Sequence, residues 1–354
     1  MPRLSVMVTG VGGRSVGHQV LHALQKCGDK YHIVATDADR FSFGLYTVDD
    51  RYLVPPASQP EYIPAILRII EKEHIRALLP GTELEVRILA GRQREIEAAG
   101  CILITNPLPV IELCSDKWNL FRWLVSNDFY TPRTARLHEW RPFVREVGFP
   151  VICKPATGSG GSRNVSLFTS ELEIGDYLEH GERRPADLLF QEYVGSGEDE
   201  YTVGVLVANS GEPIDSIALH RKLTGLSLGH KRTVGERNYL LSTGYSQGFL
   251  IRHPQVQSEC EKLAQRLGAR GPLNIQCRLV GGEVSVFEVH PRFSGTTSIR
   301  ADAGFNEPDE LIEHFVLGKK LARLSYRTNL VEIRALQHIL APISDLESIP
   351  EVDG

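Results

Sequence analysis

Apolar and polar residues alternate in blocks along the first third of the chain, and the blocks predict strands and helices in turn. Short apolar runs of the kind found in buried strands are followed by stretches with apolar residues at helical spacing. The expected strands are 4–8, 31–37, 76–80 and 101–105, and the expected helices are 16–27, 61–73 and 83–99. This alternation predicts parallel strands joined by right-handed helical crossovers, and therefore an open α/β sheet.

The pattern changes after "TNPLP" (105–109), where proline and asparagine indicate a domain boundary. Two helices are expected next, at 116–127 and 137–147. Beyond them, apolar runs are separated by short turns of small residues, of which the Gly281-Gly282 turn is the clearest. Paired strands with short turns predict antiparallel sheet with helices on one side, so the second part is expected to be α+β.

A glycine-rich turn, "TGVGGRSVG" (9–17), joins the first predicted strand to the first predicted helix. The pattern G-x-G-x-x-G at such a junction, with an acidic residue about 20 positions later, is typical of a dinucleotide site. Here Ser15 replaces the third glycine, and Asp37 ends the second strand. A nicotinamide-dependent oxidoreductase is therefore one candidate, although any sharp strand-to-helix turn also favours glycine.

Composition and charge limit the kinds of partner that this protein is expected to bind. The net charge is −5 and the basic residues form no long run, so neither nucleic acid nor a membrane surface is an expected partner. The six cysteines include no C-x-x-C pair, which favours reduced, buried thiols. No stretch approaches the about 20 apolar residues of a membrane span, and no secretory leader is recognisable. A cytoplasmic protein is expected.

A second glycine-rich loop lies in "VICKPATGSGGSRNV" (151–165), between two predicted strands. Lys154 ends the first strand, and the loop then contains Gly158, Ser159, Gly160, Gly161 and Ser162. Small residues let backbone N–H groups close over phosphates, while a lysine supplies a point charge. The alternative is a flexible hairpin with a lysine at its strand end.

Two carboxylates flank a glycine-containing turn in "FQEYVGSGEDEYTV" (190–203). An extended segment here could offer its backbone to an adenine edge, and Glu192 or Glu200 could accept hydrogen bonds from ribose hydroxyls. A solvated acidic turn is the alternative.

The segment 274–295, "NIQCRLVGGEVSVFEVHPRFSG", predicts a hairpin with a metal site. Gln276 lies on one strand, and Glu288 and His290 share a face of the other. Oxygen ligands together with bound phosphates are the usual way to hold Mg²⁺. Arg292 follows on the same face and could approach a developing negative charge. Alternatively, these side chains pair with one another only to satisfy burial.

Together these motifs resemble the ATP-grasp superfamily, and most closely one ATP-binding half of the carbamoyl phosphate synthase large subunit. The resemblance covers about residues 1–318 and includes "SDKWNLFRWL" (115–124). It implies a Rossmann-like pre-ATP-grasp domain with a parallel sheet at 1–112. A central lobe with a glycine-rich lid would follow at 113–190, and a C-terminal lobe with an antiparallel sheet and the metal site at 191–354.

The resemblance also assigns roles by position. The implied ATP contacts are Lys117, Lys154, Gly158, Ser159, Gly160, Gly161, Ser162, Gln191, Glu192, Tyr193, Val194, Glu200 and Lys231. The implied metal ligands are Gln276, Glu288 and His290, and the implied catalytic residues are Arg292 and Lys154. Gly12, Gly13, Glu83 and Arg300 are candidates for substrate binding.

The implied activity is an ATP- and Mg²⁺- (or Mn²⁺-) dependent ligase. A small-molecule carboxylate would be activated as an acylphosphate and attacked by an amine or another nucleophile, with release of ADP and phosphate. Related enzymes usually have asparagine at the position of His290, and imidazole is a poorer ligand for a hard cation. An ATP-binding module without ligase turnover is therefore kept as the alternative. A homodimer is a candidate assembly.

Overall fold

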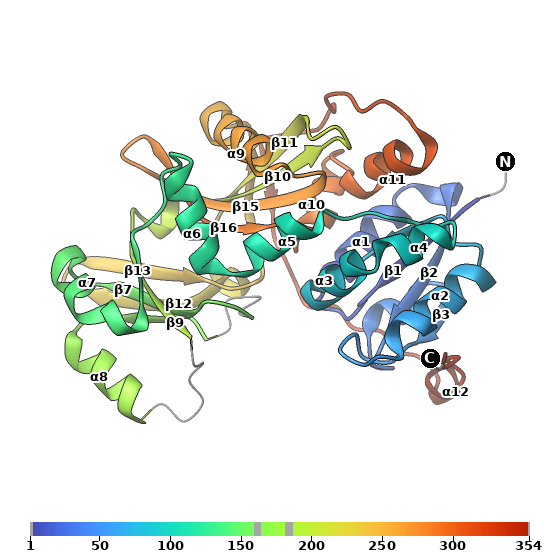
Figure 1. Ribbon diagram of the computed structural model, residues 1–354, viewed down its shortest axis with the longest axis horizontal. Coiled ribbons are helices and arrows are strands. Elements are labelled where there is room, and N and C mark those ends of the chain that lie inside the picture. The colour runs from blue at the N-terminus through green and yellow to red at the C-terminus, as the bar shows by residue number, and fades with distance from the viewer. Residues whose placement is uncertain (1–2, 159–163, 181–186, 353–354) are drawn as a thin grey trace.

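The protein begins with a parallel sheet covered by helices on both faces (Figure 1). The structure, a computed structural model, describes residues 3–158, 164–180 and 187–352. The strand order is β3-β2-β1-β4-β5, and every pairing is parallel. The elements of this part are β1 (Leu4–Thr9), α1 (Val16–Gln25), β2 (Tyr31–Asp37), β3 (Asp50–Leu53), α2 (Tyr62–Lys72), β4 (Ala77–Leu79), α3 (Glu83–Gly91), α4 (Gln93–Ala98), β5 (Ile102–Leu103) and α5 (Leu108–Ser115).

The alternation of side chains along β1 explains why both faces of this sheet carry helices. Val6 and Val8 belong to a core that includes residues of α1, whereas Met7 belongs to a second core that includes residues of α2. All three side chains are fully buried. Burying successive residues on opposite faces requires a layer on each side, as parallel sheets do in general.

A four-stranded antiparallel sheet follows, with the order β6-β9-β7-β8. The predicted hairpin around the second glycine-rich loop is confirmed, because β7 pairs with β8. The elements of this part are α6 (Lys117–Ser126), β6 (Thr134–Arg136), α7 (Trp140–Val147), β7 (Val151–Pro155), β8 (Ser166–Phe168), α8 (Glu171–His180) and β9 (Leu188–Glu192).

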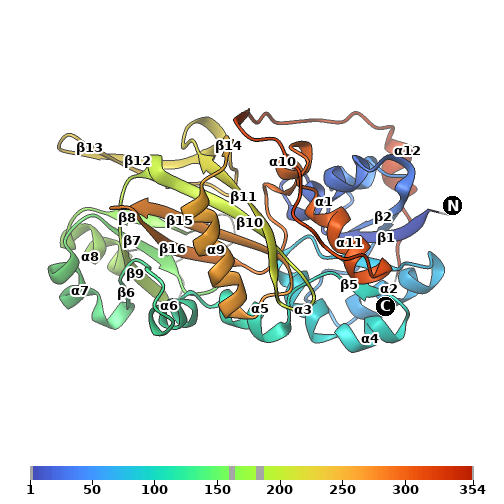
Figure 2. The same cartoon turned by 90° about the horizontal axis from the view of Figure 1, so that it is seen from above.

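The largest sheet has six strands in the order β16-β15-β10-β11-β14-β17, and α9 lies across one face (Figure 2). Its antiparallel pairings confirm the predicted combination of an α/β part with an α+β part. In the same part of the chain, β12 and β13 form a separate two-stranded antiparallel sheet. The elements of this part are β10 (Glu200–Val207), β11 (Pro213–Arg221), β12 (Leu228–Val234), β13 (Arg237–Ser242), β14 (Gly248–Ile251), α9 (Pro254–Leu267), β15 (Gly271–Val280), β16 (Glu283–His290), α10 (Thr297–Asp302), α11 (Glu307–Leu317), β17 (Leu330–Glu332) and α12 (Ile343–Glu347). Short 3₁₀ turns occur at Gly28–Lys30, Phe43–Tyr46, Leu137–Glu139, Gly197–Asp199 and Gly225–Ser227.

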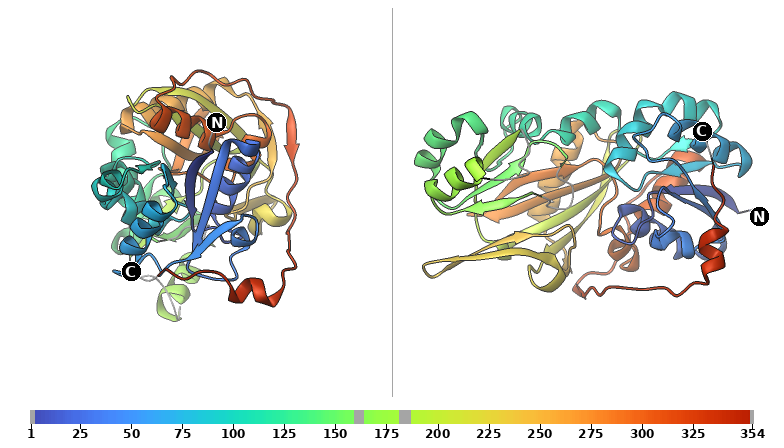
Figure 3. Two further views of the ribbon diagram at one scale, coloured as in Figure 1. Left: turned by 90° about the vertical axis from the view of Figure 1, so that its right-hand side faces the viewer. Right: turned by 90° about the horizontal axis from the view of Figure 1, so that it is seen from below.

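The parallel sheet is joined to the C-terminal part by a shared apolar core. Residues of β1 and α1 pack in one cluster with residues of β11, α10 and α11. After β17 the chain runs back along the outside to the first sheet (Figure 3). There the Leu53 N–H donates to the Pro350 carbonyl at 2.8 Å, and the Val352 N–H donates to the Leu53 carbonyl at 3.0 Å. Within the described ranges, no helix has both the length and the apolar composition needed to cross a membrane.

Close packing at the end of β1 explains why the β1–α1 turn needs glycine. A Cβ added to Gly17 would lie 2.4 Å from the carbonyl oxygens of Gly10 and Thr9, which no side chain tolerates. Asp37 is also accounted for, because its Oδ2 accepts from the Gly12 N–H at 3.0 Å and its Oδ1 accepts from the Asp39 N–H at 3.0 Å. The features that suggested a dinucleotide site therefore have a structural explanation within the turn itself.

Candidate functional site

A cleft of about 1780 Å³ lies where the carboxyl ends of the parallel strands face the large antiparallel sheet. The β1–α1 turn and the β4–α3 turn form one wall, and the ends of β15 and β16 contribute to the other. In the order β3-β2-β1-β4-β5, strands β1 and β4 are neighbours at the point where the chain reverses direction across the sheet. Open α/β sheets bind ligands at such a switch point, outside the carboxyl ends of the strands.

The predicted metal ligands come together on the β15–β16 hairpin. Gln276 pairs directly with Glu288, and Asn274 pairs with His290, both on one side of the register shift between Gln276 and Cys277. The Nε2 atom of His290 lies 3.4 Å from Oε2 of Glu288. Gln276, Glu288 and His290 all line the cleft. The hairpin therefore presents oxygen and nitrogen donors in one small area.

Glu288 is surrounded by positive charge. Lys117, the first residue of α6, places its Nζ atom 3.9 Å from Oε1 of Glu288. Burial by itself raises the pKa of the Glu288 carboxyl, but the charges of His290, Lys117 and Lys154 outweigh it and hold that pKa well below its usual range. The carboxylate is therefore ionised at neutral pH, as a metal ligand must be.

Glu83, at the start of α3, reaches from the first part of the chain to the end of β16. Its Oε1 atom lies 2.6 Å from Nη2 of Arg292 and 3.5 Å from Nδ1 of His290. Burial opposes ionisation of Glu83, but Arg292 and His290 keep the pKa of its carboxyl below the ordinary value. The predicted substrate residue and the predicted catalytic arginine are thus partners in this structure.

Lys154, on a strand of the four-stranded sheet, lies close to the six-stranded sheet, because it lines a small pocket together with Phe287 of β16. Its Nζ atom donates to Oε1 of Gln191 at 2.8 Å, and Gln191 in turn donates to the Thr134 hydroxyl at 3.0 Å. Burial lowers the pKa of the Lys154 ammonium to about 8. A small pocket here is lined by Lys154, Gln191 and Phe287, and also by Lys117, which lines the large cleft as well. Lys117 thus connects the two regions.

Glu200 is paired with two buried arginines. Its Oε1 accepts from Nη1 of Arg221 at 2.8 Å, and its Oε2 accepts from Nη2 of Arg278 at 3.0 Å. All three residues are at most 5% exposed. The predicted contact between Glu200 and a ribose stays a prediction, because both oxygens already have partners here.

The segment 191–194, which the resemblance implies to be the adenine-binding hinge, also has protein partners. Glu192 forms an ion pair with Arg133 at 2.9 Å, and the guanidinium of Arg278 lies 4.5 Å from the centre of the Tyr193 ring. The same arginine donates to the Val194 carbonyl at 3.0 Å. Arg278 therefore supports both the hinge and Glu200.

Other predicted residues lie in different surroundings. Gly13 and Gly158 line the cleft, whereas Lys231 is exposed on β12. Arg300 is 1% exposed, and its guanidinium binds Glu307 at 3.1 Å and Asn274 at 2.6 Å. This arrangement gives Arg300 a structural role beneath the cleft, and its contact with substrate stays a prediction. Ser159, Gly160, Gly161 and Ser162 lie outside the described residues.

Several cleft residues were not predicted from the sequence. Among them, Arg14, Tyr245 and Arg334 line the cleft from three separate segments. Arg14 belongs to the glycine-rich turn, so its position beside a crevice could have been inferred from the motif. Tyr245 and Arg334 belong to no motif, and only folding brings them to this site.

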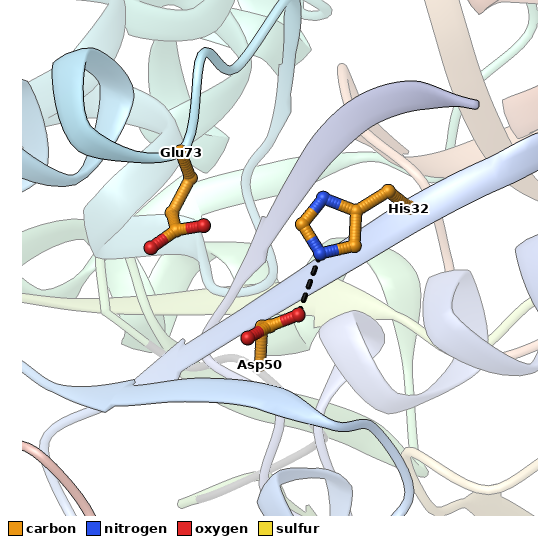
Figure 4. Close-up of side chains that lie close together, drawn as sticks. All are labelled: His32, Asp50 and Glu73. Carbon is orange, nitrogen blue, oxygen red and sulfur yellow. Dashed lines mark hydrogen bonds and ion pairs between the residues drawn. The ribbon is translucent and has the colours of Figure 1, made fainter. Parts of the chain in front are cut away.

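A second group of possible metal-ligand side chains consists of His32, Asp50 and Glu73 (Figure 4). This group lies at the opposite end of the parallel strands from the cleft. His32 and Asp50 are at the amino ends of β2 and β3, whereas the cleft is at the carboxyl ends. The His32 Nε2 atom lies 2.6 Å from Oδ2 of Asp50, and the other ring nitrogen lies 3.1 Å from the Ser5 hydroxyl. Tyr52 donates to Glu73. These hydrogen bonds account for the group without a metal.

Comparisons with known proteins identify proteins that this chain resembles in sequence and in fold. Residues 6–104 match the family model of the PylC-like N-terminal domain, and residues 184–339 match the model described as ATP-grasp in the biosynthetic pathway with Ter operon. The carbamoyl phosphate synthase large chain of Methanocorpusculum labreanum is 24% identical over 99% of this chain and 34% of its own length. That of Caldanaerobacter subterraneus is 25% identical over 98% of this chain and 32% of its own length. The chain thus spans about a third of these relatives.

Solved structures show the same fold at low sequence identity. The ADP complex of PurK, an N5-carboxyaminoimidazole ribonucleotide synthetase, has a TM-score of 0.66 at 14% identity and covers 92% of this chain and 80% of its own. The biotin carboxylase domain dimer of Hydrogenobacter thermophilus 2-oxoglutarate carboxylase has a TM-score of 0.65 at 17% identity, with 92% and 73% covered. An L-amino acid ligase from Bacillus licheniformis has a TM-score of 0.60 at 15% identity, with 89% and 75% covered.

Proposed function

We propose that this chain, which carries an ATP-grasp domain, is an ATP-dependent ligase that joins a small-molecule carboxylate to an amine. The observation that carries the proposal is the meeting of Lys117, Glu288 and Arg292 in one large cleft between the two parts of the chain. Phosphoryl transfer depends mainly on positioning and on neutralising charge, and this cleft supplies cations and an ionised carboxylate for both. We further propose that it works in the cytoplasm, and that a homodimer is its assembly.

The donor set fits a hard divalent cation such as Mg²⁺ or Mn²⁺. Glu288 provides an ionised carboxylate, Gln276 an amide oxygen opposite it, and His290 an imidazole nitrogen beside it. Oxygen donors together with phosphate oxygens are what Mg²⁺ prefers. When bound, the cation would neutralise charge on the transferred phosphoryl group.

The chain's own residues would position ATP and the two substrates. Lys154 and Lys117 would bind phosphate oxygens, and Arg292 would stabilise the charge that develops during transfer. A carboxylate oxygen of the substrate would bond to the γ-phosphorus as the bond from that phosphorus to ADP breaks. The amine nitrogen would then attack the acyl carbon, and the bond between that carbon and the phosphate oxygen would break to release phosphate. The proton of the amine would pass to solvent.

The proposal is tested by measuring ADP and phosphate release with a panel of carboxylates and amines. Turnover that is lost in both Lys154→Ala and Glu288→Ala supports a ligase. Tight ATP binding without ADP release across the panel would instead indicate an ATP-binding module. Because the family resemblance places His290 where related enzymes usually have asparagine, His290→Asn tests whether the imidazole limits metal-dependent turnover. Saturable NADH binding would favour an oxidoreductase.

ATP affinity should depend on pH through Lys154. The ammonium of the free protein loses its proton at a pKa of about 8, and only the charged form attracts phosphate. The dissociation constant for ATP should therefore rise about tenfold for each pH unit above this value, as linkage requires. Equilibrium binding between pH 7 and 9.5 measures this rise. Lys154→Met should bind ATP more weakly and remove the dependence, and an unchanged pH profile in that variant would count against the role of Lys154.

A further inference from the structure

Two arginines approach one end of the cleft from distant segments of the chain. The guanidinium of Arg14, in the β1–α1 turn, lies 5.3 Å from the centre of the Tyr245 ring. Arg334, after β17, donates from Nη2 to the carbonyl of Gly295. Arg14, Tyr245 and Arg334 all line the cleft, as does Gly295 in the turn that follows Arg292. A ligand held here would therefore lie beside the turn that carries the proposed catalytic arginine.

These two arginines differ from other cations of the cleft in their partners. Lys117, Arg292 and Arg92 each form an ion pair with a glutamate. Within the described part of the chain, no carboxylate lies within 4 Å of the guanidinium of Arg14 or Arg334, and Glu332 acts on Arg334 only through its charge from farther away. The Nε atom of Arg334 is buried and has no hydrogen-bond partner. The Nε atoms of Arg221, Arg292 and Arg300 are also buried without a partner, so what sets Arg334 apart is its place at the cleft without a close carboxylate.

The loop that carries Tyr245 is held in place by hydrogen bonds from a buried arginine. Arg221 is 2% exposed, and its Nη2 donates to the carbonyl of Thr243 at 3.0 Å and to that of Tyr245 at 2.9 Å. The loop joins β13 to β14, and Gly244 and Ser246 line the cleft with Tyr245. The surface between Arg14 and Arg334 is therefore held in position before a ligand arrives, which lowers the entropic cost of binding.

We propose that this end of the cleft binds a second anionic group of the substrate, remote from its reacting carboxyl or amine, and that Arg14, Arg334 and Tyr245 recognise it. A guanidinium presents paired N–H donors that match the oxygens of a carboxylate or a phosphate. The Tyr245 hydroxyl adds a further donor. The inference deepens the proposed ligase function and rests on it for the reacting end of the substrate. It names the substrate class as a dicarboxylate or a phosphorylated acid or amine.

Equilibrium binding tests this directly, without turnover. Isothermal titration of the full chain would compare glutarate, glycerol 3-phosphate and butyrate, the last of which lacks a second charge. At least one of the two dianions should bind about tenfold or more tightly than butyrate. Preference for glutarate would indicate a dicarboxylate substrate, and preference for glycerol 3-phosphate a phosphorylated one. Equal affinity for all three probes would overturn the proposal.

Variants assign the binding to the two arginines. Arg14→Gln and Arg334→Gln should each weaken binding of the preferred dianion about tenfold. Arg92→Gln is the matched control and should change it less than about twofold, because Arg92 is already paired with Glu95. Arg14 lies in an exposed turn, so its variant is expected to fold. Dianion binding that survives both substitutions would refute the assignment. A chain that releases no ADP but binds dianions through these arginines would refute only the ligase function.

Discussion

Glu288→Gln should reduce ATP-dependent ADP release by about 10²–10³-fold, the range seen when one preorganised electrostatic contact is removed from an active site. The Glu288 carboxylate is within 4 Å of both Lys117 and His290, and it pairs across the hairpin with Gln276. The variant keeps the shape of the side chain but loses the charge. We expect the concentration of Mg²⁺ needed for half-maximal turnover to rise together with the loss in rate.

A control on the same strand separates this effect from damage to the hairpin. Glu283 begins β16 and is exposed, so Glu283→Gln should change ADP release less than about twofold. Steady-state assays across a Mg²⁺ series would measure both variants, and urea denaturation would verify that both are folded. Wild-type turnover in Glu288→Gln would remove this residue from the proposed metal site.

Regular hydrophobic patterns predicted the fold better than they predicted its boundaries. The strand expected at 31–37 is β2, and the helix expected at 61–73 is α2 with one residue fewer at each end. The helix expected at 83–99 is divided into α3 and α4, because Arg92 has non-helical backbone angles. Apolar residues continue at helical spacing through that break, so periodicity alone does not reveal it.

The domain boundary predicted at 105–109 stays a prediction. The sequence analysis placed no helix there, whereas α5 begins at Leu108 with Pro109 in its first turn. Proline is tolerated there because the N–H that it lacks would have no helical partner. Strand β3 was missed because it has only four residues and begins with a charged pair, Asp50-Arg51. Strand β3 forms because it pairs with β2 and with residues near the C-terminal end of the chain. No local sequence pattern reveals these distant pairings.

The candidate site was predictable where one strand carries several functional residues. Glu288 and His290 are two apart on a strand, so the alternation of side chains was enough to place them on one face. The pairings of Glu83 with Arg292, and of Glu200 with Arg221 and Arg278, join residues that are distant in sequence. Such partners depend on how the sheets and turns pack, and a single sequence does not specify them.

The buried charges around Glu200 lead to a second large effect. Glu200→Gln should lower the free energy of unfolding without ATP by about 3–5 kcal/mol, the usual result of removing one partner from a buried ion pair. The amide has one acceptor oxygen where the carboxylate has two, so its NH₂ group would face the donors of one of the two arginines. Arg221 and Arg278 would then remain buried without a neutralising charge. Urea denaturation monitored by fluorescence and circular dichroism would measure the change.

The same variant distinguishes a structural role of Glu200 from a role in ribose binding alone. Glu198 lies two residues away and is exposed, so Glu198→Gln should leave stability within about 0.5 kcal/mol of the wild type. Arg221 also donates to the carbonyls of Thr243 and Tyr245. Loss of its ion pair with Glu200 should therefore speed hydrogen exchange in the loop between β13 and β14. If Glu200→Gln weakened ATP binding but left stability and loop exchange unchanged, Glu200 would act through the nucleotide only.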